Sequence, residues 1–162
     1  MPKTRQETSS FHDHAPVQFT ASHTIRATPA QVFEALADTP SWKRWFPALT
    51  DSRWTSQAPF GVGSTRQVKI GPMAIDEEFI IWEPGKRWGF TITKTTLPMA
   101  RAVAEVMELE PIDDGTACTV THRMSMEPLP GMRRLSRLMA RGIESGMAGG
   151  LRGLDHHLAN AR

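Results

Sequence analysis

Cysteine, tyrosine and long apolar runs are scarce or missing in this sequence. Cys118 is the only cysteine, so the chain can form no internal disulfide and hold no cysteine-rich zinc site. Tyrosine does not occur, so no phenol group can serve as a catalytic acid. The longest uninterrupted apolar run, Phe79 to Trp82, has four residues and is far too short to span a membrane. The first residues also lack the apolar stretch of a signal peptide, and we expect a cytoplasmic protein without stable membrane insertion.

The motifs of common cofactor and nucleophile sites are absent as well. The sequence contains no HExxH, GxGxxG, GxxxxGK[ST] or GxSxG, and the adjacent His156 and His157 point to different sides of a helix. We therefore expect neither a metal nor a cofactor.

Charge gives little indication of a partner. Lys and Arg total 19 against 17 Asp and Glu, a net charge of +2, and no dense basic stripe predicts binding to nucleic acid. One basic cluster lies near the C-terminus, where a solvated helix face is the first interpretation and an anionic partner or membrane surface the second. Its members are Arg133, Arg134, Arg137, Arg141, Arg152 and Arg162.

The order of predicted elements indicates one domain of mixed class. Residues 1–15 are polar and without periodicity, which is typical of a flexible tail, and residues 16–162 form the domain. A strand is predicted at Val17 to Arg26. Thr28, Pro29 and Gln31 then have the spacing of a capping box that begins a short helix, and a second short helix or loop follows at Ser41 to Leu49. The next runs are rich in β-formers and too closely spaced for crossover helices, so the sheet is antiparallel. These runs are Ser52 to Ser56, Thr65 to Ile70, Ala74 to Glu83, Arg87 to Thr95, Arg101 to Glu110 and Thr116 to Met126.

From Pro130 onward the hydrophobic period becomes helical. The pattern predicts one long amphipathic helix over about 130–160, with Leu135, Met139, Ile143 and Leu154 facing the sheet. Five glycines interrupt it, at a cost of about 0.8–1.0 kcal/mol each relative to alanine. Either they leave room for a ligand, or they allow close packing or a kink. They are Gly142, Gly146, Gly149, Gly150 and Gly153.

This order of elements and four local stretches resemble the SRPBCC superfamily, also called START-like or helix-grip, and within it the polyketide cyclase/dehydrase and lipid transport branch. The stretches are TPAQVFEALADTPSWKRW from Thr28, GVGST from Gly61, EFIIWEPGKRWGF from Glu78, and the closing GLDHHLA. The resemblance implies an α+β helix-grip fold. In it, a curved antiparallel sheet wraps around the long C-terminal helix, two short helices follow the first strand, and a ligand cavity lies between sheet and helix.

Two polar residues stand out on the predicted inner face of the sheet. Alternation along the last two strands places Glu105 and His122 among apolar neighbours, and centring the turn on Ile112 to Gly115 places them directly opposite each other. Such a pair is a candidate acid–base dyad or polar anchor. The alternative is a satisfied buried pair without a role in function.

Further residues are predicted to bind the ligand. The same alternation places aromatic, aliphatic and basic residues of the sheet around a cavity, and plain core packing is the alternative for the aromatic ones. The resemblance places the short helices and the Leu97–Pro98 turn at the cavity mouth. The complete set is Trp42, Trp45, Phe46, Phe79, Trp88, Phe90, Lys94, Arg101, Met107, Val120, Met139, Ile143, Gly146 and Gly150.

Three functions fit these observations, because the resemblance carries no shared catalytic motif. Binding of a hydrophobic small molecule, such as a lipid or a polyketide-like aromatic compound, requires only apolar walls and leads. A cyclase/dehydratase that uses Glu105 and His122 is the second, and a co-chaperone-like protein-interaction domain is the third. Whether the chain forms a homodimer stays open.

Overall fold

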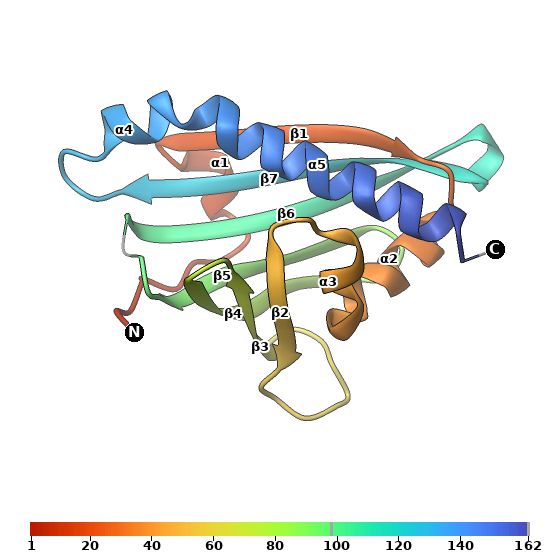
Figure 1. Cartoon of the computed structure of the whole chain (residues 1–162), viewed down its shortest axis with the longest axis horizontal. Coiled ribbons are helices and arrows are strands. Elements are labelled where there is room, and N and C mark those ends of the chain that lie inside the picture. The colour runs from red at the N-terminus through yellow and green to blue at the C-terminus, as the bar shows by residue number, and fades with distance from the viewer. Residues whose placement is uncertain (98, 162) are drawn as a thin grey trace.

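Seven antiparallel strands form one curved sheet in the computed structural model, which describes residues 1–97 and 99–161 (Figure 1). The strands lie in the order β1-β7-β6-β5-β4-β3-β2. Their bounds are β1 (Val17–Ile25), β2 (Leu49–Trp54), β3 (Thr65–Ile70), β4 (Met73–Glu83), β5 (Arg87–Thr95), β6 (Ala100–Ile112) and β7 (Ala117–Pro128). The predicted antiparallel sheet is therefore confirmed.

Helices cover the concave face of the sheet and one of its ends. After β1 come α2 (Pro29–Ala37), a 3₁₀ turn η1 (Thr39–Ser41) and α3 (Trp42–Trp45), and α5 (Ala140–Ala159) runs across the sheet (Figure 1). A second 3₁₀ turn, η2 (Asp113–Gly115), joins β6 to β7. The two short helices expected after the first strand are present. A search of the helices within residues 1–97 and 99–161 finds no candidate for a bilayer-spanning segment.

The predicted capping box begins α2. The Gln31 backbone N–H donates to Thr28 Oγ1 at 3.2 Å, and the Thr28 backbone N–H donates to Gln31 Oε1 at 3.0 Å. Two N–H groups that the first turn would leave without partners are thereby satisfied. Pro29 occupies the first helical position, where its fixed φ fits and its missing N–H costs nothing.

The C-terminal helix is broken, unlike the single helix that the sequence pattern predicts. A short helix α4 (Arg133–Leu138) ends at Met139, whose ψ of −6° departs from helical geometry, and α5 begins at the next residue. Because α4 is a separate helix, Leu135 does not pack on the sheet and is 40% exposed, so its predicted orientation is wrong. Farther along, Leu151 and Leu154 are buried against the sheet, the latter as predicted.

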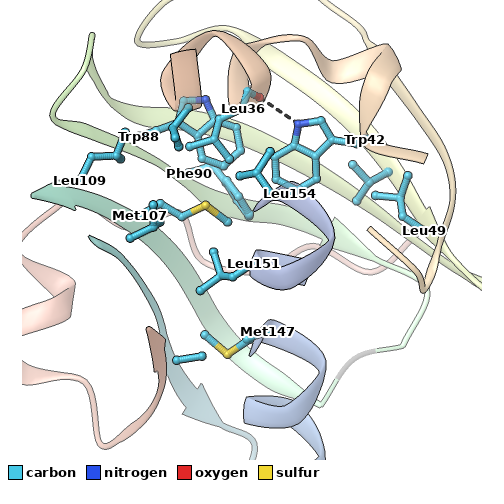
Figure 2. Close-up of a cluster of buried hydrophobic side chains, with 14 of the residues drawn as sticks. Leu36, Trp42, Leu49, Trp88, Phe90, Met107, Leu109, Met147, Leu151 and Leu154 are labelled. Carbon is cyan, nitrogen blue, oxygen red and sulfur yellow. Dashed lines mark hydrogen bonds between the residues drawn. The ribbon is translucent and has the colours of Figure 1, made fainter. Parts of the chain in front are cut away.

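The core fills the space between the sheet and the C-terminal half of α5. Figure 2 shows Met147, Leu151 and Leu154 of α5 facing strand residues such as Phe90 and Met107. At the end of this cluster Trp42 Nε1 donates a hydrogen bond of 2.9 Å to the carbonyl oxygen of Leu36, which ties α3 to α2.

The N-terminal segment packs against the sheet, which differs from the flexible tail expected for residues 1–15. Thr4 N–H donates to the Thr93 carbonyl of β5 at 3.0 Å, and Arg5 N–H donates to the Arg101 carbonyl of β6 at 2.7 Å, so these residues bridge the two strands. A short helix α1 (Phe11–His14) then places Phe11, 1% exposed, over Ala102 and Ala104. Phe11 fills the space that these small residues leave, so the segment belongs to the domain.

Candidate functional site

An apolar cavity of about 250 Å³ lies between the sheet and the junction of α4 with α5. Of the fourteen described residues that line it, eleven are apolar, and the three polar ones are Thr4, Thr95 and Ser136. Leu97 and Met139 line the cavity and are also 54% and 42% exposed, so the cavity mouth lies between the β5–β6 turn and the end of α4. Its volume is slightly below the ~300–1,000 Å³ of typical small-molecule pockets.

Methionine dominates the cavity wall. Six of the nine methionines line it: Met73, Met99, Met124, Met126, Met132 and Met139. Methionine is unbranched and polarizable, so its side chain adapts to ligands of different shape and makes favourable contacts with aromatic rings. The wall is therefore suited to an apolar guest and sets no strict shape for it.

The cavity includes few of the residues predicted to bind a ligand. Met139 and Ile143 line it, and Leu97 forms part of the mouth as expected, whereas Pro98 lies outside the described residues. The strand residues of the predicted set lie deeper in the core, where each is at most 3% exposed. These residues are Phe79, Trp88, Phe90, Met107 and Val120.

The predicted aromatic mouth around α3 is wrong. Trp42 and Trp45 are each 4% exposed and belong to the core, and α3 contacts the C-terminal half of α5. In Figure 1, α3 and α4 lie at different ends of the molecule. Phe46 is half-buried and stacks on Trp42, with ring centroids 6.0 Å apart. The aromatic residues thus anchor α3 and do not border the cavity.

The glycines predicted to leave room for a ligand do not line the cavity either. An added Cβ at Gly150 would lie 2.6 Å from Cε2 of Phe46, so this glycine allows close packing of α3 on α5. Gly146 is exposed and has no other residue near its missing side chain. The packing interpretation therefore holds at Gly150, and Gly146 faces solvent.

Lys94 and Arg101, predicted to line the rim, point away from the cavity because bulges interrupt the alternation. Between Ile92 and Lys94 the register of β5 against β4 shifts by one residue, so Thr95 lines the cavity and Lys94 Nζ lies 3.6 Å from Asp76. Arg101 lies at a second bulge, and its guanidinium is 4.0 Å from the carboxylate of Glu127. Both side chains are about half exposed and each pairs with a carboxylate.

Glu105 and His122 do meet on the concave face, although their strands are paired in a different register. His122 Nε2 and Glu105 Oε2 form a hydrogen bond of 2.7 Å. Glu105 pairs with Met124 and His122 with Met107, so the two polar residues are diagonal neighbours and not directly opposed. The turn is centred one residue later than assumed, because β6 extends to Ile112, η2 begins at Asp113 and the ladder resumes at Ala117.

This polar pair lies just beyond the inner end of the cavity. Val103 and Met124 line the cavity and are the neighbours of Glu105 on the same face, along β6 and across to β7. The Glu105 side chain is 14% exposed and that of His122 is 4% exposed. Nδ1 of His122 is buried and has no hydrogen-bond partner within the described residues. A ligand that extends past Val103 would therefore meet a carboxylate and an imidazole.

A second buried polar pair, Arg66 of β3 with Glu77 of β4, lies on the same sheet as Glu105 and His122. Arg66 Nε donates a hydrogen bond to Glu77 Oε2, and both residues are at most 3% exposed. Burial raises the pKa of Glu77 to about 7, although Arg66 opposes the shift and Glu105 adds to it.

An aromatic box holds the Arg66 guanidinium. Its Cζ lies 4.2 Å from the ring centre of Trp42 and 4.8 Å from that of Trp88, with Phe79 and Phe90 slightly farther away. The ring faces provide the cation–π attraction that partly offsets desolvation of the charge. The sequence-based predictions missed this pair, although Arg66 shares its strand face with Val68 and Glu77 shares its face with Ile75 and Phe79.

Comparison with known proteins identifies the family. Residues 16–159 match the family described as polyketide cyclase/dehydrase and lipid transport. The chain belongs to this family. It is 39% identical over 119 residues to an uncharacterized protein of Mycobacterium tuberculosis, a match that covers 73% of this chain and 70% of the relative. An uncharacterized protein of Mycobacterium bovis matches to the same extent.

Solved structures show the same fold at low sequence identity. A START superfamily protein of Mycobacterium smegmatis superposes with a TM-score of 0.73 at 10% identity, covering 87% of this chain and 98% of that one. The ZhuI aromatase/cyclase of Streptomyces sp. R1128 gives 0.71 at 12% identity, covering 87% and 92%. The helix-grip, START-like fold expected from the sequence is thereby confirmed. Family and fold together point to hydrophobic ligand binding or polyketide cyclase-type activity.

Proposed function

We propose that the chain binds a hydrophobic small molecule, a lipid or a polyketide-like aromatic compound, in the methionine-lined cavity. The observation that carries this proposal is the wall itself, in which three of the fourteen described lining residues are polar. An apolar guest that enters displaces water from this wall, which is favourable by about 25 cal/mol for each Å² of apolar surface buried. The exposed rim at Leu97 and Met139 provides the entrance.

A fluorescence titration with the neutral apolar dye N-phenyl-1-naphthylamine tests the proposal. Ile143→Trp places a larger ring in the cavity wall, and we expect it to weaken dye binding at least tenfold. Ile112→Trp is the matched control, because Ile112 is also half-buried but lies at the far end of β6. Equal loss in both variants, or no saturable binding by the unmodified chain, would contradict the proposal. Thermal unfolding of both variants checks that they fold.

The Glu105–His122 hydrogen bond favours cyclase-type catalysis as a second candidate. Glu105 holds His122 through a hydrogen bond of 2.7 Å to Nε2, and the buried Nδ1 has no partner among the described residues. A base at this position could remove a proton from a carbon between two carbonyl groups. The resulting carbanion would attack another carbonyl carbon of the same molecule, and the new alkoxide would take the first proton back from His122. The hydroxyl group would then leave as water, together with the second proton of the carbon that attacked.

Replacing His122 separates catalysis from anchoring. If the pair is catalytic, His122→Ala should abolish ring closure of a linear poly-β-ketone thioester, followed by ultraviolet absorbance and by the loss of one water in mass spectra. If the pair is a polar anchor, the same variant should bind a carbonyl-containing ligand about 5–150-fold more weakly, the loss of one buried hydrogen bond. Turnover that is unchanged in His122→Ala would exclude the catalytic role.

A further inference from the structure

The short helix α4 exposes apolar side chains that the fold does not use. Leu138 is 82% exposed and Leu135 is 40% exposed, while Ser136 on the same helix is buried and marks its inner side. Six large apolar residues are exposed within the described part of the chain. Four of them lie on α4, at its end or on the β5–β6 turn: Leu97, Leu135, Leu138 and Met139.

Four arginines flank these leucines. Arg133, Arg134, Arg137 and Arg141 are exposed, and none forms an ion pair with another described residue. At about 100° per residue Arg133, Arg134 and Arg137 cover one sector of α4, and Leu138 and Leu135 cover the adjoining sector. Uncompensated positive charge beside exposed leucines is an arrangement that suits a surface with anionic groups over an apolar layer.

The same surface surrounds the cavity mouth. Met132, Ser136 and Met139 line the cavity from the α4 side, and Leu97 lines it from the β5–β6 turn. Figure 1 shows α4 and this turn at the same end of the molecule. A flat layer that contacted Leu138 and Leu97 together would therefore cover the opening.

We propose that α4 and the β5–β6 turn dock on a lipid bilayer that carries anionic headgroups. The leucines enter the boundary between headgroups and acyl chains, and the arginine guanidinium groups pair with lipid phosphates. The cavity mouth then opens onto the apolar layer, so a hydrophobic ligand passes between bilayer and protein without crossing water. Docking itself does not require the proposed ligand binding, which the dye titration tests separately.

Sedimentation with sucrose-loaded vesicles tests the docking surface. Vesicles of phosphatidylcholine alone are compared with an equal mixture of phosphatidylcholine and phosphatidylglycerol, at low and at high salt. We expect binding to the anionic vesicles only. Binding should weaken at high salt, because salt screens the attraction between the arginines and the lipid phosphates. Arg134→Gln/Arg137→Gln should lower the vesicle affinity about 30-fold, at about fivefold for each charge. Leu138→Ser should lower it about tenfold or more.

Two control variants make the same kind of change elsewhere on the surface: one removes two positive charges, and the other removes one exposed apolar side chain. Lys43→Gln/Arg44→Gln removes two exposed charges from α3, and Val62→Ser removes a side chain that is 69% exposed on the β2–β3 loop. Both controls should bind anionic vesicles as the unmodified chain does. Equal losses in the controls and the α4 variants, or equal binding to both vesicle types, would overturn the proposal.

A second copy of the chain is the other occupant that the measurements would reveal. Sedimentation velocity without lipid should show the same mass for the unmodified chain and for Leu138→Ser. A dimer that Leu138→Ser dissociates, together with no binding to anionic vesicles, would reassign this surface to self-association. Because Leu138 is 82% exposed, this variant should unfold at the temperature of the unmodified chain.

Discussion

Two glycines of α5 differ sharply in what surrounds them, which allows the packing of α3 on α5 to be tested. An added Cβ at Gly146 would meet no atom within 4 Å. At Gly153 it would lie 1.9 Å from the carbonyl oxygen of Trp45 and 3.0 Å from the carbonyl carbon. These are backbone atoms, so they cannot move away as a flexible side chain could. Substituting alanine at each position therefore gives opposite effects on stability.

The magnitudes follow from helix propensity and overpacking. Gly146→Ala gains the propensity difference alone and should stabilise the protein by about 0.8–1.0 kcal/mol. Gly153→Ala gains the same amount but overpacks a backbone contact. Such overpacking costs about 1–3 kcal/mol, and the short distance to Trp45 places this site at the upper end. We expect a net loss of about 2 kcal/mol for Gly153→Ala.

Thermal unfolding followed by circular dichroism measures both effects. For a domain of this size each kcal/mol shifts the Tm by about 2–4 °C. Gly146→Ala should therefore unfold about 2–4 °C higher than the unmodified chain, and Gly153→Ala about 4–8 °C lower. A Gly153→Ala protein as stable as the unmodified chain would refute the close approach of α3 to α5. It would favour the alternative interpretation, in which the glycines leave room for a ligand.

Three further predictions follow from buried groups. Burial raises the pKa of the Cys118 thiol to about 11, so Ellman's reagent should label it only after unfolding in urea. Rapid labelling of the native protein would contradict the burial of this thiol. The pKa of Glu77 rises from 4.5 to about 7 on folding, so its contribution to stability is fully present below pH 4.5 and is lost as the pH rises through 7. Glu77→Gln should lack this part of the pH dependence of the Tm, and an identical profile would disprove the shift. Phe11→Ala should cost about 3 kcal/mol in the unfolding free energy, whereas a loose N-terminal segment predicts no change.

The elements of the fold were predictable because each carries a strong local signal. The capping box at Thr28 and Gln31 fixed the start of α2, and closely spaced β-rich runs required an antiparallel sheet. The break at Met139 was not predictable, since the hydrophobic period continues through it and no proline or glycine interrupts α4. The packing of Phe11 was missed because the residues around it are polar and its partners, Ala102 and Ala104, lie far along the chain.

The candidate site was harder to predict than the fold, because bulges decide which residues face inward. The shift in β5 exchanged Lys94 for Thr95 at the cavity, and alternation alone cannot reveal such a shift. Glu105 and His122 still met, since a register error of two residues keeps each side chain on its face. The methionine wall had a signal in the sequence, namely the cluster of methionines from Met124 to Met139.

Methyl NMR of the nine methionines tests most directly whether the cavity is the ligand site. The protein is labelled with [methyl-¹³C]methionine and titrated with N-phenyl-1-naphthylamine. Six methionines line the cavity, and Met1, Met107 and Met147 do not, so the last three serve as internal controls. We predict the largest shifts for the six lining methyl groups, with Met132 and Met139 at the mouth among them. Shifts confined to Met107 and Met147, or no shifts at saturating dye, would contradict the proposed binding site.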